Sequence, residues 1–370
     1  MAETTSLLTG CFRILFHYDV AEGLDLTKVR KLLGLAEALE ARGFPRRTPE
    51  YIRFEHAPVI ERSGPFTLKS GEQFACSIKY YSFAVVAIEV QVPFTCDWHE
   101  LVAQSSRWMD AGDIEPTARE IIEQHLSRVA PAVVRLNKLW LQEGYLVISL
   151  QHISQAADQR PTAAEIISAH GNEIVQLVRG ETLPLDPKTV EETLQARLSY
   201  YPSDLVVIGP SAAFVYDRAE DAAATTQVLA FAKMQLLEFR YYDNWMSTLL
   251  EEVYSMLERK RNTLLSRWSL PRDAQRVNAI RLDVMELTER IDNAIKFVSD
   301  TYYARVYRLA ANRIGLPDYR NLVDQKLRTA GELYGFMVDQ FNEARSFVLE
   351  AGIVILMLLD VILLVVLLKE

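Results

Sequence analysis

The side chains best suited to bind a metal ion or act as a base or nucleophile are dispersed along this chain. Its six histidines and three cysteines form no His-Glu-x-x-His or Cys-x-x-Cys pattern. Cys96 and His99 are three positions apart, but the neighbouring Phe94 and Trp98 favour simple packing there. A catalytic zinc site needs several such ligands at suitable spacing. The sequence therefore predicts no metal site, and we identify no catalytic residue in it.

Motifs that hold phosphate groups or present a nucleophilic serine are also absent. The chain has neither Gly-x4-Gly-Lys-Ser/Thr nor Gly-x-Gly-x-x-Gly, so a nucleotide-phosphate cradle has no support. It also lacks the Gly-x-Ser-x-Gly elbow of α/β-hydrolases. We therefore predict no cofactor and no enzymatic activity.

A mixed group of charged and aromatic residues falls within Leu236–Met246. Its members are Arg240, Tyr241, Tyr242, Asp243 and Trp245. An arginine among aromatic rings and an acid could form a binding site, but arginine also stacks well on aromatic faces. We favour the interpretation that this stripe docks a helix onto the neighbouring N-terminal domain.

The most apolar stretch of the chain is its end. From Ala351 to Leu368 the sequence is apolar except for Asp360. Eighteen residues at about 1.5 Å each span roughly 27 Å, close to the hydrocarbon core of a bilayer. We therefore expect one C-terminal transmembrane helix that acts as a tail anchor. The alternative is a buried C-terminal helix of a soluble domain.

Two acids are associated with this expected anchor. Glu350 would lie at the membrane surface and Asp360 well inside the bilayer. An acid near the middle of a spanning helix costs about 2.5–3.5 kcal/mol, which the surrounding aliphatic residues offset. Because such acids usually face protein or water, we predict a homo-oligomer with Asp360 in the contact. The alternative is an acid that is protonated in lipid.

A basic turn is expected to touch the same membrane. It combines basic side chains with a tryptophan, as membrane interfaces do. Its residues are Arg259, Lys260, Arg261, Arg267 and Trp268. An anionic leaflet attracts each basic residue by about 1 kcal/mol. The alternative is a solvated basic loop.

The elements that would position these residues change character at about residue 218. Residues 1–217 mix strands, such as Cys11–Val20, with helices, such as the one that begins after an Asp25 cap. Gly209-Pro210 is expected to be a turn between two short strands. Because there is no strict βαβ alternation, we predict an α+β head domain with a largely antiparallel sheet.

After residue 218 only helical patterns remain. Heptad seams run from Val277 to Val298 and from Val323 to Val348. They predict a three-helix antiparallel coiled-coil stalk over residues 218–350, followed by the transmembrane anchor at 351–368. The alternative is a helical bundle in which the heptad pattern is incidental.

Composition limits the compartment and the partners. The formal net charge of −9 argues against nucleic acid as the main partner. Three cysteines without metal-like spacing favour free thiols in a reducing compartment. The N-terminus lacks the features of a secretory signal. We therefore expect a single-pass membrane protein whose N-terminal bulk lies in the cytoplasm.

Three stretches resemble the "required for meiotic nuclear division" proteins, also called the YagE family. They are Tyr18–Leu33, Lys79–Val90, and the final helix with Leu349-Glu350, an apolar run and Asp360. The family has tryptophan where this chain has Ala351, and usually glutamate at the later acid. The resemblance implies a membrane-anchored protein without an established enzymatic activity. Some eukaryotic members are mitochondrial and support organelle translation, but this chain has no transit peptide, so that role is not expected here.

These observations favour a tail-anchored membrane scaffold that recruits unknown protein partners to its cytosolic head. One alternative is an oligomeric membrane protein involved in ion transport. Another is a membrane-bound enzyme with a site in the head domain.

Overall fold

A computed structural model describes residues 7–35, 58–110, 112, 114–154, 160–260, 282 and 302–367. The chain forms two compact units. Unit 1 comprises Met1–Tyr241 and Ile291–Tyr319, and unit 2 comprises Tyr242–Arg290 and Arg320–Glu370. Each unit is described by itself.

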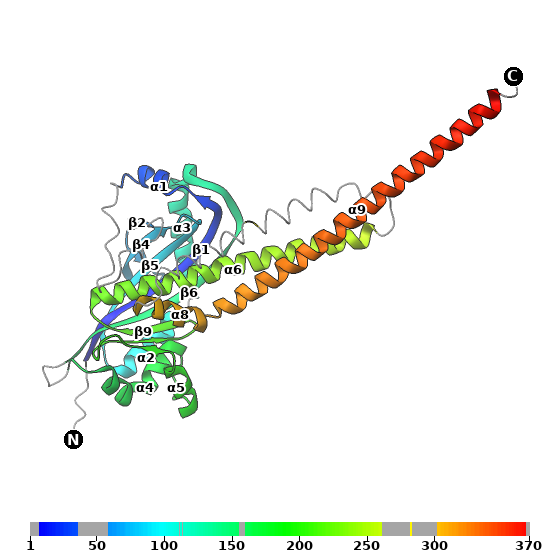
Figure 1. Cartoon of the computed structure of the whole chain (residues 1–370). Coiled ribbons are helices and arrows are strands. Elements are labelled where there is room, and N and C mark those ends of the chain that lie inside the picture. Colours follow the sequence, from blue (N-terminus) through cyan, green and yellow to red (C-terminus); the bar gives the residue numbers. More distant parts are fainter. Residues whose placement is uncertain are drawn as a thin grey trace. The chain divides into compact units, whose positions relative to one another are not determined.

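Unit 1 is built on a nine-stranded sheet in the order β2-β4-β5-β1-β6-β9-β8-β7, with β3 paired to β4 (Figure 1). The strands are β1 (Leu7–Leu24), β2 (Val59–Arg62), β3 (Phe66–Thr67), β4 (Gln73–Tyr80), β5 (Val85–Cys96), β6 (Val133–Ser154), β7 (Arg197–Leu198), β8 (Leu205–Ile208) and β9 (Ala212–Tyr216). Among these strands, pairing is antiparallel except between β6 and β9. The long β1 and β6 pair from Leu7–Ser154 to Leu24–Val133 and form the centre of the sheet.

The helices of unit 1 are α1 (Leu26–Leu32), α2 (Trp98–Met109), α3 (Ile114–Arg128), the 3-10 turn η1 (Ala130–Ala132), α4 (Ala163–Arg179), α5 (Pro187–Leu194), the first part of α6 (Ala219–Lys260) and α8 (Tyr302–Arg313). Side-chain caps begin α1, α2, α4 and α5. Asp25 caps α1 by accepting from the Lys28 N–H. Thr162 and Glu165 form a capping box at the start of α4. Such caps satisfy backbone donors that the helix leaves unpaired.

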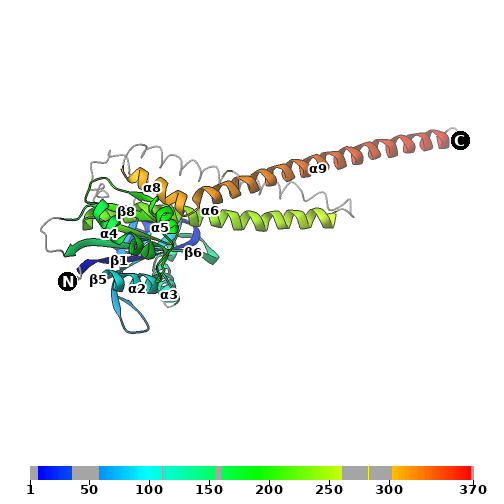
Figure 2. The same cartoon turned by 90° about the horizontal axis from the view of Figure 1, so that it is seen from below.

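Strand alternation gives the sheet two different faces. On β1, Phe12, Ile14, Phe16 and Tyr18 join an apolar core shared with α2, α3 and α4. The opposite face carries buried polar side chains, such as His17, and lies against α6. Figure 2 shows α6 and α8 on one side of the sheet and α2 and α3 on the other.

Unit 2 contains the later part of α6 and most of α9 (Leu316–Leu367). Met246, Leu249 and Ala330 form a small buried cluster between these helices. The Lys326 ammonium lies 2.5 Å from Asp243 Oδ1 and 2.6 Å from Ser247 Oγ. Of the expected heptad seams, the one from Val277 to Val298 lies outside the described residues.

The predicted membrane anchor is wrong for the residues that the structure describes. Within them, no helix combines the length and the apolar character that crossing a bilayer requires. Asp360 interrupts the apolar run that begins at Ala351.

Several expectations fail with the anchor. The predicted fold class, an α+β head with a coiled-coil stalk ending in a transmembrane helix at 351–368, is contradicted in its membrane-anchored stalk. The C-terminal span, the single-pass localisation and the tail-anchored description are wrong for the same reason. The homo-oligomer expected through Asp360 loses its physical basis, because it assumed an acid inside lipid.

Candidate functional site

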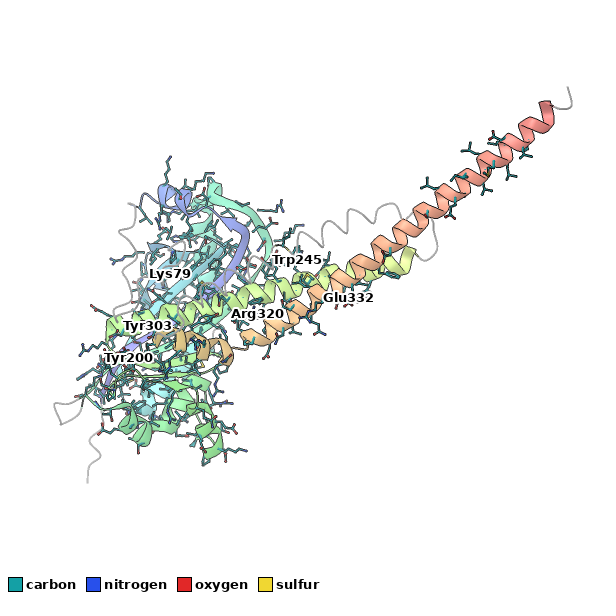
Figure 3. All side chains as sticks on the ribbon, viewed as in Figure 1. Lys79, Tyr200, Trp245, Tyr303, Arg320 and Glu332 are labelled. Carbon is teal, nitrogen blue, oxygen red and sulfur yellow. The ribbon has the colours of Figure 1, made fainter. Side chains whose placement is uncertain are left out.

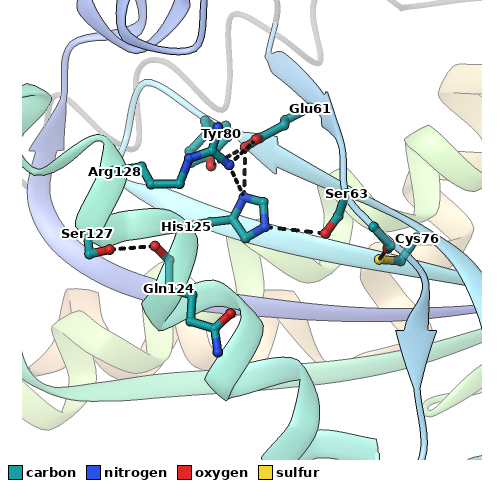
Figure 4. A network of polar contacts seen from close by, with 9 residues as sticks. Glu61, Ser63, Cys76, Tyr80, Gln124, His125, Ser127 and Arg128 are labelled. Carbon is teal, nitrogen blue, oxygen red and sulfur yellow. Dashed lines mark hydrogen bonds and ion pairs between the residues drawn. The ribbon is translucent and has the colours of Figure 1, made fainter.

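Ser63, His125 and Glu61 form a continuous series of polar contacts in unit 1 (Figure 4). Ser63 Oγ lies 3.3 Å from His125 Nε2, and His125 Nδ1 lies 2.9 Å from Glu61 Oε2. Nε2 therefore meets a hydroxyl, and Nδ1 meets the Glu61 carboxylate, with Arg128 Nη1 at 3.3 Å beside it. This order of groups is the arrangement by which serine hydrolases activate their nucleophile.

A strand end and a helix end bring the three residues together. Glu61 is the third residue of β2, and Ser63 follows β2 directly, so alternation directs both side chains to the same face. The Ser63 N–H donates to the Cys76 carbonyl oxygen at 3.3 Å, which holds Ser63 beside β4. His125 lies in the last turn of α3, a helix that buries Ile122 and Leu126 against the core.

Two further residues hold the Glu61 carboxylate in place. Tyr80 donates its hydroxyl to Oε2 at 2.8 Å, and Arg128 Nη1 donates to Oε1 at 2.7 Å. Burial alone would raise the pKa of Glu61, but the hydrogen bonds from His125 and Tyr80 and the Arg128 charge outweigh it and lower that pKa. Glu61 is therefore ionised at neutral pH, and a carboxylate facing Nδ1 favours the tautomer whose Nε2 accepts from Ser63.

The acid is sheltered while the hydroxyl can be reached from solvent. The side chains of Glu61 and His125 are 10% and 14% exposed. Ser63 is half-buried, and the next residues, Gly64 and Pro65, are exposed. A Cβ added at Gly64 would meet no atom within 4 Å. A substrate could therefore approach Ser63 without displacing a side chain at position 64.

A second polar cluster lies on the opposite face of the sheet, beneath α6. On β5, Glu89 pairs with Arg13 and with Lys79, each at 2.6 Å. On β6, Glu143 pairs with Lys233 at 2.8 Å and with Arg240. All four cation–acid pairs join elements of unit 1. They link β1 and β4 to β5, and α6 to β6.

The residues predicted to dock the helix are not gathered into one site. Arg240 donates to Glu143 on β6. Burial raises the pKa of Tyr241, which lies beside Asp19 and Glu22. In unit 2, by contrast, Asp243 accepts from Lys326.

Tyr242 and Trp245 also lie in unit 2, with ring centroids 6.4 Å apart.

The other predicted site residues form no described cluster. Glu350 and Asp360 are exposed on α9. α6 ends at Lys260, and the side chains of Arg259 and Lys260 lie outside those described. Arg261, Arg267 and Trp268 lie wholly outside the described residues. Across the described part of the chain, no group of three or more histidine, cysteine or acidic side chains is arranged to hold a metal ion.

Sequence reasoning missed Ser63, His125 and Glu61 altogether. His125 is 62 residues from Ser63 and 64 from Glu61, and no motif links them. The local signal was the Glu-x-Ser spacing at the end of a short strand, which is common and carries little information by itself. The pairing depends on how α3 packs against β2 and β4.

Comparison with known proteins identifies a family for the head. A family model described as "Uncharacterized protein MJ0711, N-terminal domain" matches residues 9–222, more than half of the chain. The "Uncharacterized protein MJ0711" of Methanocaldococcus jannaschii is 21% identical over 190 residues, which are 51% of this chain and 58% of that protein. The match therefore covers less than two thirds of the relative. No solved structure matches.

These findings overturn the resemblance to the YagE, or "required for meiotic nuclear division", family. The matching family model is a different one, and it ends before the helices that carried the strongest part of the resemblance. Leu349-Glu350 and Asp360 lie on α9, well beyond residue 222. An apolar helix with one acid is too general a pattern to define a family.

Proposed function

We propose that this chain, which belongs to the MJ0711 N-terminal domain family, is a serine-dependent acyl hydrolase. Ser63 is the nucleophile, His125 the general base and Glu61 the acid that orients the imidazole. The proposal rests on two polar contacts of the His125 imidazole: Nε2 contacts the Ser63 hydroxyl and Nδ1 contacts the Glu61 carboxylate. All three residues lie within the part of the chain that matches the family.

The chemistry follows from these contacts. His125 Nε2 accepts the hydroxyl proton while Ser63 Oγ bonds to the carbonyl carbon of an ester. The imidazolium then gives that proton to the leaving alcohol as the ester C–O bond breaks. Water attacks the acyl-serine in the second half, and its proton passes through His125 to restore the Ser63 hydroxyl. Atoms and protons balance, and the net reaction is ester plus water to acid plus alcohol.

The ionised Glu61 lies against Nδ1 and can balance the positive charge that His125 carries between these steps. The last turn of α3 also has the polarity that favours cations, while Arg128 Nη1 lies 3.3 Å from the same nitrogen. Arg128 and Tyr80 keep the carboxylate from rotating away. These two are positioning residues, because they act on Glu61 and not on the substrate. The Gly64 N–H follows the nucleophile and is the donor we assign to the developing oxyanion.

Turnover of a small activated ester tests the proposal. The full chain should hydrolyse p-nitrophenyl acetate with burst kinetics, and Ser63→Ala should lower kcat by about 10²-fold or more. Ser127→Ala is the matched control, because the exposed Ser127 hydroxyl donates only to the Gln124 carbonyl oxygen. We expect that control to keep full activity. Equal turnover in wild type and Ser63→Ala would mean that the network is structural only.

The partner-recruiting role expected from the sequence stays a second proposal. The apolar side chains from Ile353 to Ile362 on α9 are 55–64% exposed. Exposed apolar stretches of this kind mark interaction sites. Proteins retained by the full chain but lost by a chain ending at Phe347 would support recruitment through this helix. The ion-transport and membrane-enzyme alternatives both assumed the span that the described residues lack.

A further inference from the structure

His17 is a fully buried histidine on β1, and within the described structure neither ring nitrogen has a hydrogen-bond partner. Its Cα partners on the neighbouring strands are Ala87 of β5 and Glu143 of β6. α6 covers this position, because Met234 and Leu237 form one apolar cluster with Ala87. The imidazole is therefore enclosed between the sheet and α6.

Ionisable groups lie on this face of the sheet, on every element packed against the ring. They are Arg13 and Asp19 on β1, Lys79 on β4 (Figure 3), Glu89 on β5, Glu143 on β6 and Lys233 on α6. The acids that could balance a charge on the imidazole are already committed. Glu89 pairs with two cations, and Glu143 pairs with Lys233 and with one further cation on α6. Burial raises the pKa of Asp19 to about 7, and its carboxyl accepts from Asn137, so below that pH no ionised acid of this cluster is left to pair with an imidazolium.

The enclosed ring is stable only as the neutral imidazole. Burial, followed by the positive charges of Lys233 and Lys79, lowers the pKa of His17 to about 3. Once exposed to water, a histidine titrates near pH 6.5. The stability that His17 lends to the covered state is therefore complete above pH 6.5 and falls as the pH drops from 6.5 toward 3.

α6 contacts this face through apolar residues such as Met234 and Leu237, and through Lys233 and Arg240, both paired to the same carboxylate of Glu143. The opposite face of the sheet has its own extensive apolar core with α2, α3 and α4, which does not include α6. The sheet can therefore stay folded while the α6 segment 219–241 moves.

We propose that His17 makes the seating of α6 on the sheet acid-sensitive, so that protonation of its imidazole releases α6 from the β1–β6 face. The device is separate from the Ser63 site on the other face. Because His17 takes up one proton on release, its own contribution raises the population of the released state about tenfold for each pH unit below about 6.5. The packing of α6 against the sheet is therefore pH-dependent.

Hydrogen exchange, measured by mass spectrometry on the full chain, tests whether acid releases α6. Protection factors, corrected for the intrinsic pH dependence of exchange, are measured at pH 7, 6 and 5 for peptides of α6 and of β5. The ratio of α6 protection factors in wild type to those in His17→Gln should fall about tenfold per unit below pH 6.5, because Asp19 titrates in both proteins and cancels in the ratio. Peptides of β5 should stay protected in both proteins. His152→Gln removes an exposed histidine of β6 and should behave as wild type.

Two results would overturn the proposal. The first is an equal loss of α6 protection in wild type and His17→Gln. The second is a simultaneous loss of protection in α6 and β5, which would mean global unfolding and no separate release of α6. If His17→Gln does not fold, His17→Leu replaces it. Leucine cannot be protonated, so the ratio of α6 protection in wild type to that in His17→Leu should again fall about tenfold per unit, and a constant ratio would refute the role of His17.

Discussion

His125 Nδ1 lies 2.9 Å from Glu61 Oε2, although the two residues are 64 positions apart in the chain. The opposite nitrogen of the same ring faces Ser63 Oγ at 3.3 Å. The contact between Glu61 and His125 therefore decides which ring nitrogen can take a proton from the serine. It also ties β2 to the end of α3, so structure and chemistry depend on one carboxylate.

The substitution Glu61→Gln should separate these two roles. It keeps the size of the side chain but removes the negative charge that balances the imidazolium. We expect kcat for p-nitrophenyl acetate to fall about 10²-fold or more, with KM changed much less. Thermal unfolding should show a loss of about 1–3 kcal/mol, because the Tyr80 hydroxyl and the Arg128 guanidinium lose a charged acceptor. Unchanged kcat would exclude Glu61 from the chemistry.

Asp19 should make the stability of unit 1 depend on pH. Burial raises its pKa to about 7, against which the Asn137 hydrogen bond acts only weakly. The folded state thus holds a proton that the unfolded state releases near pH 3.8. The stabilising contribution of that proton is present below about pH 4 and is lost as the pH rises toward 7.

Asp19→Asn should remove this dependence. The difference in unfolding free energy between the variant and wild type should shift in favour of the variant by up to roughly 4 kcal/mol between pH 4 and pH 8. Urea unfolding of both proteins at four pH values measures it. Because His17 is present in both proteins, its own acid sensitivity cancels in the difference. A constant difference over that range would show that Asp19 does not titrate as described.

Gly10 should be irreplaceable in the central strand. A Cβ at this position would overlap the Ser149 carbonyl oxygen and lie 2.5 Å from the Phe94 ring. The backbone of β6 cannot move away without breaking the β1–β6 pairing. Gly10→Ala should therefore lower the free energy of unfolding by about 3 kcal/mol or more. Gly144→Ala is the matched control in the same pair of strands. Its nearest contact is the Phe16 ring at 3.3 Å, so the cost should be clearly smaller.

Local features of the fold were predictable from the sequence because their causes are local. The strand expected over Cys11–Val20 lies within β1, and the Asp25 cap starts α1 as expected. Gly209-Pro210 separates β8 from β9, as a turn pair should. Each of these depends on neighbouring side chains or on the backbone preferences of glycine and proline.

The candidate site was not predictable because its residues meet only through tertiary packing. Glu61 and Ser63 share a face through strand alternation, but nothing in their neighbourhood indicates that α3 will place His125 between them. The polar face beneath α6 was missed for a similar reason. One face of β1 carries His17 and Asp19, and the sequence does not show that a helix will bury them.

The expected membrane anchor shows the opposite error. There we inferred a transmembrane helix from a local apolar run, but the described part of α9 does not have the length and composition of a membrane span.

The most direct test of the proposed chemistry is covalent labelling by a fluorophosphonate, which reacts with activated serines. Intact mass and peptide mapping of the full chain should show one adduct, located on Ser63 and absent from Ser63→Ala. Labelling should also be strongly reduced in His125→Gln, while Ser127→Ala should be labelled like wild type. A chain that stays unlabelled, or that is labelled equally in wild type and His125→Gln, would contradict the assignment of Ser63 as an activated nucleophile.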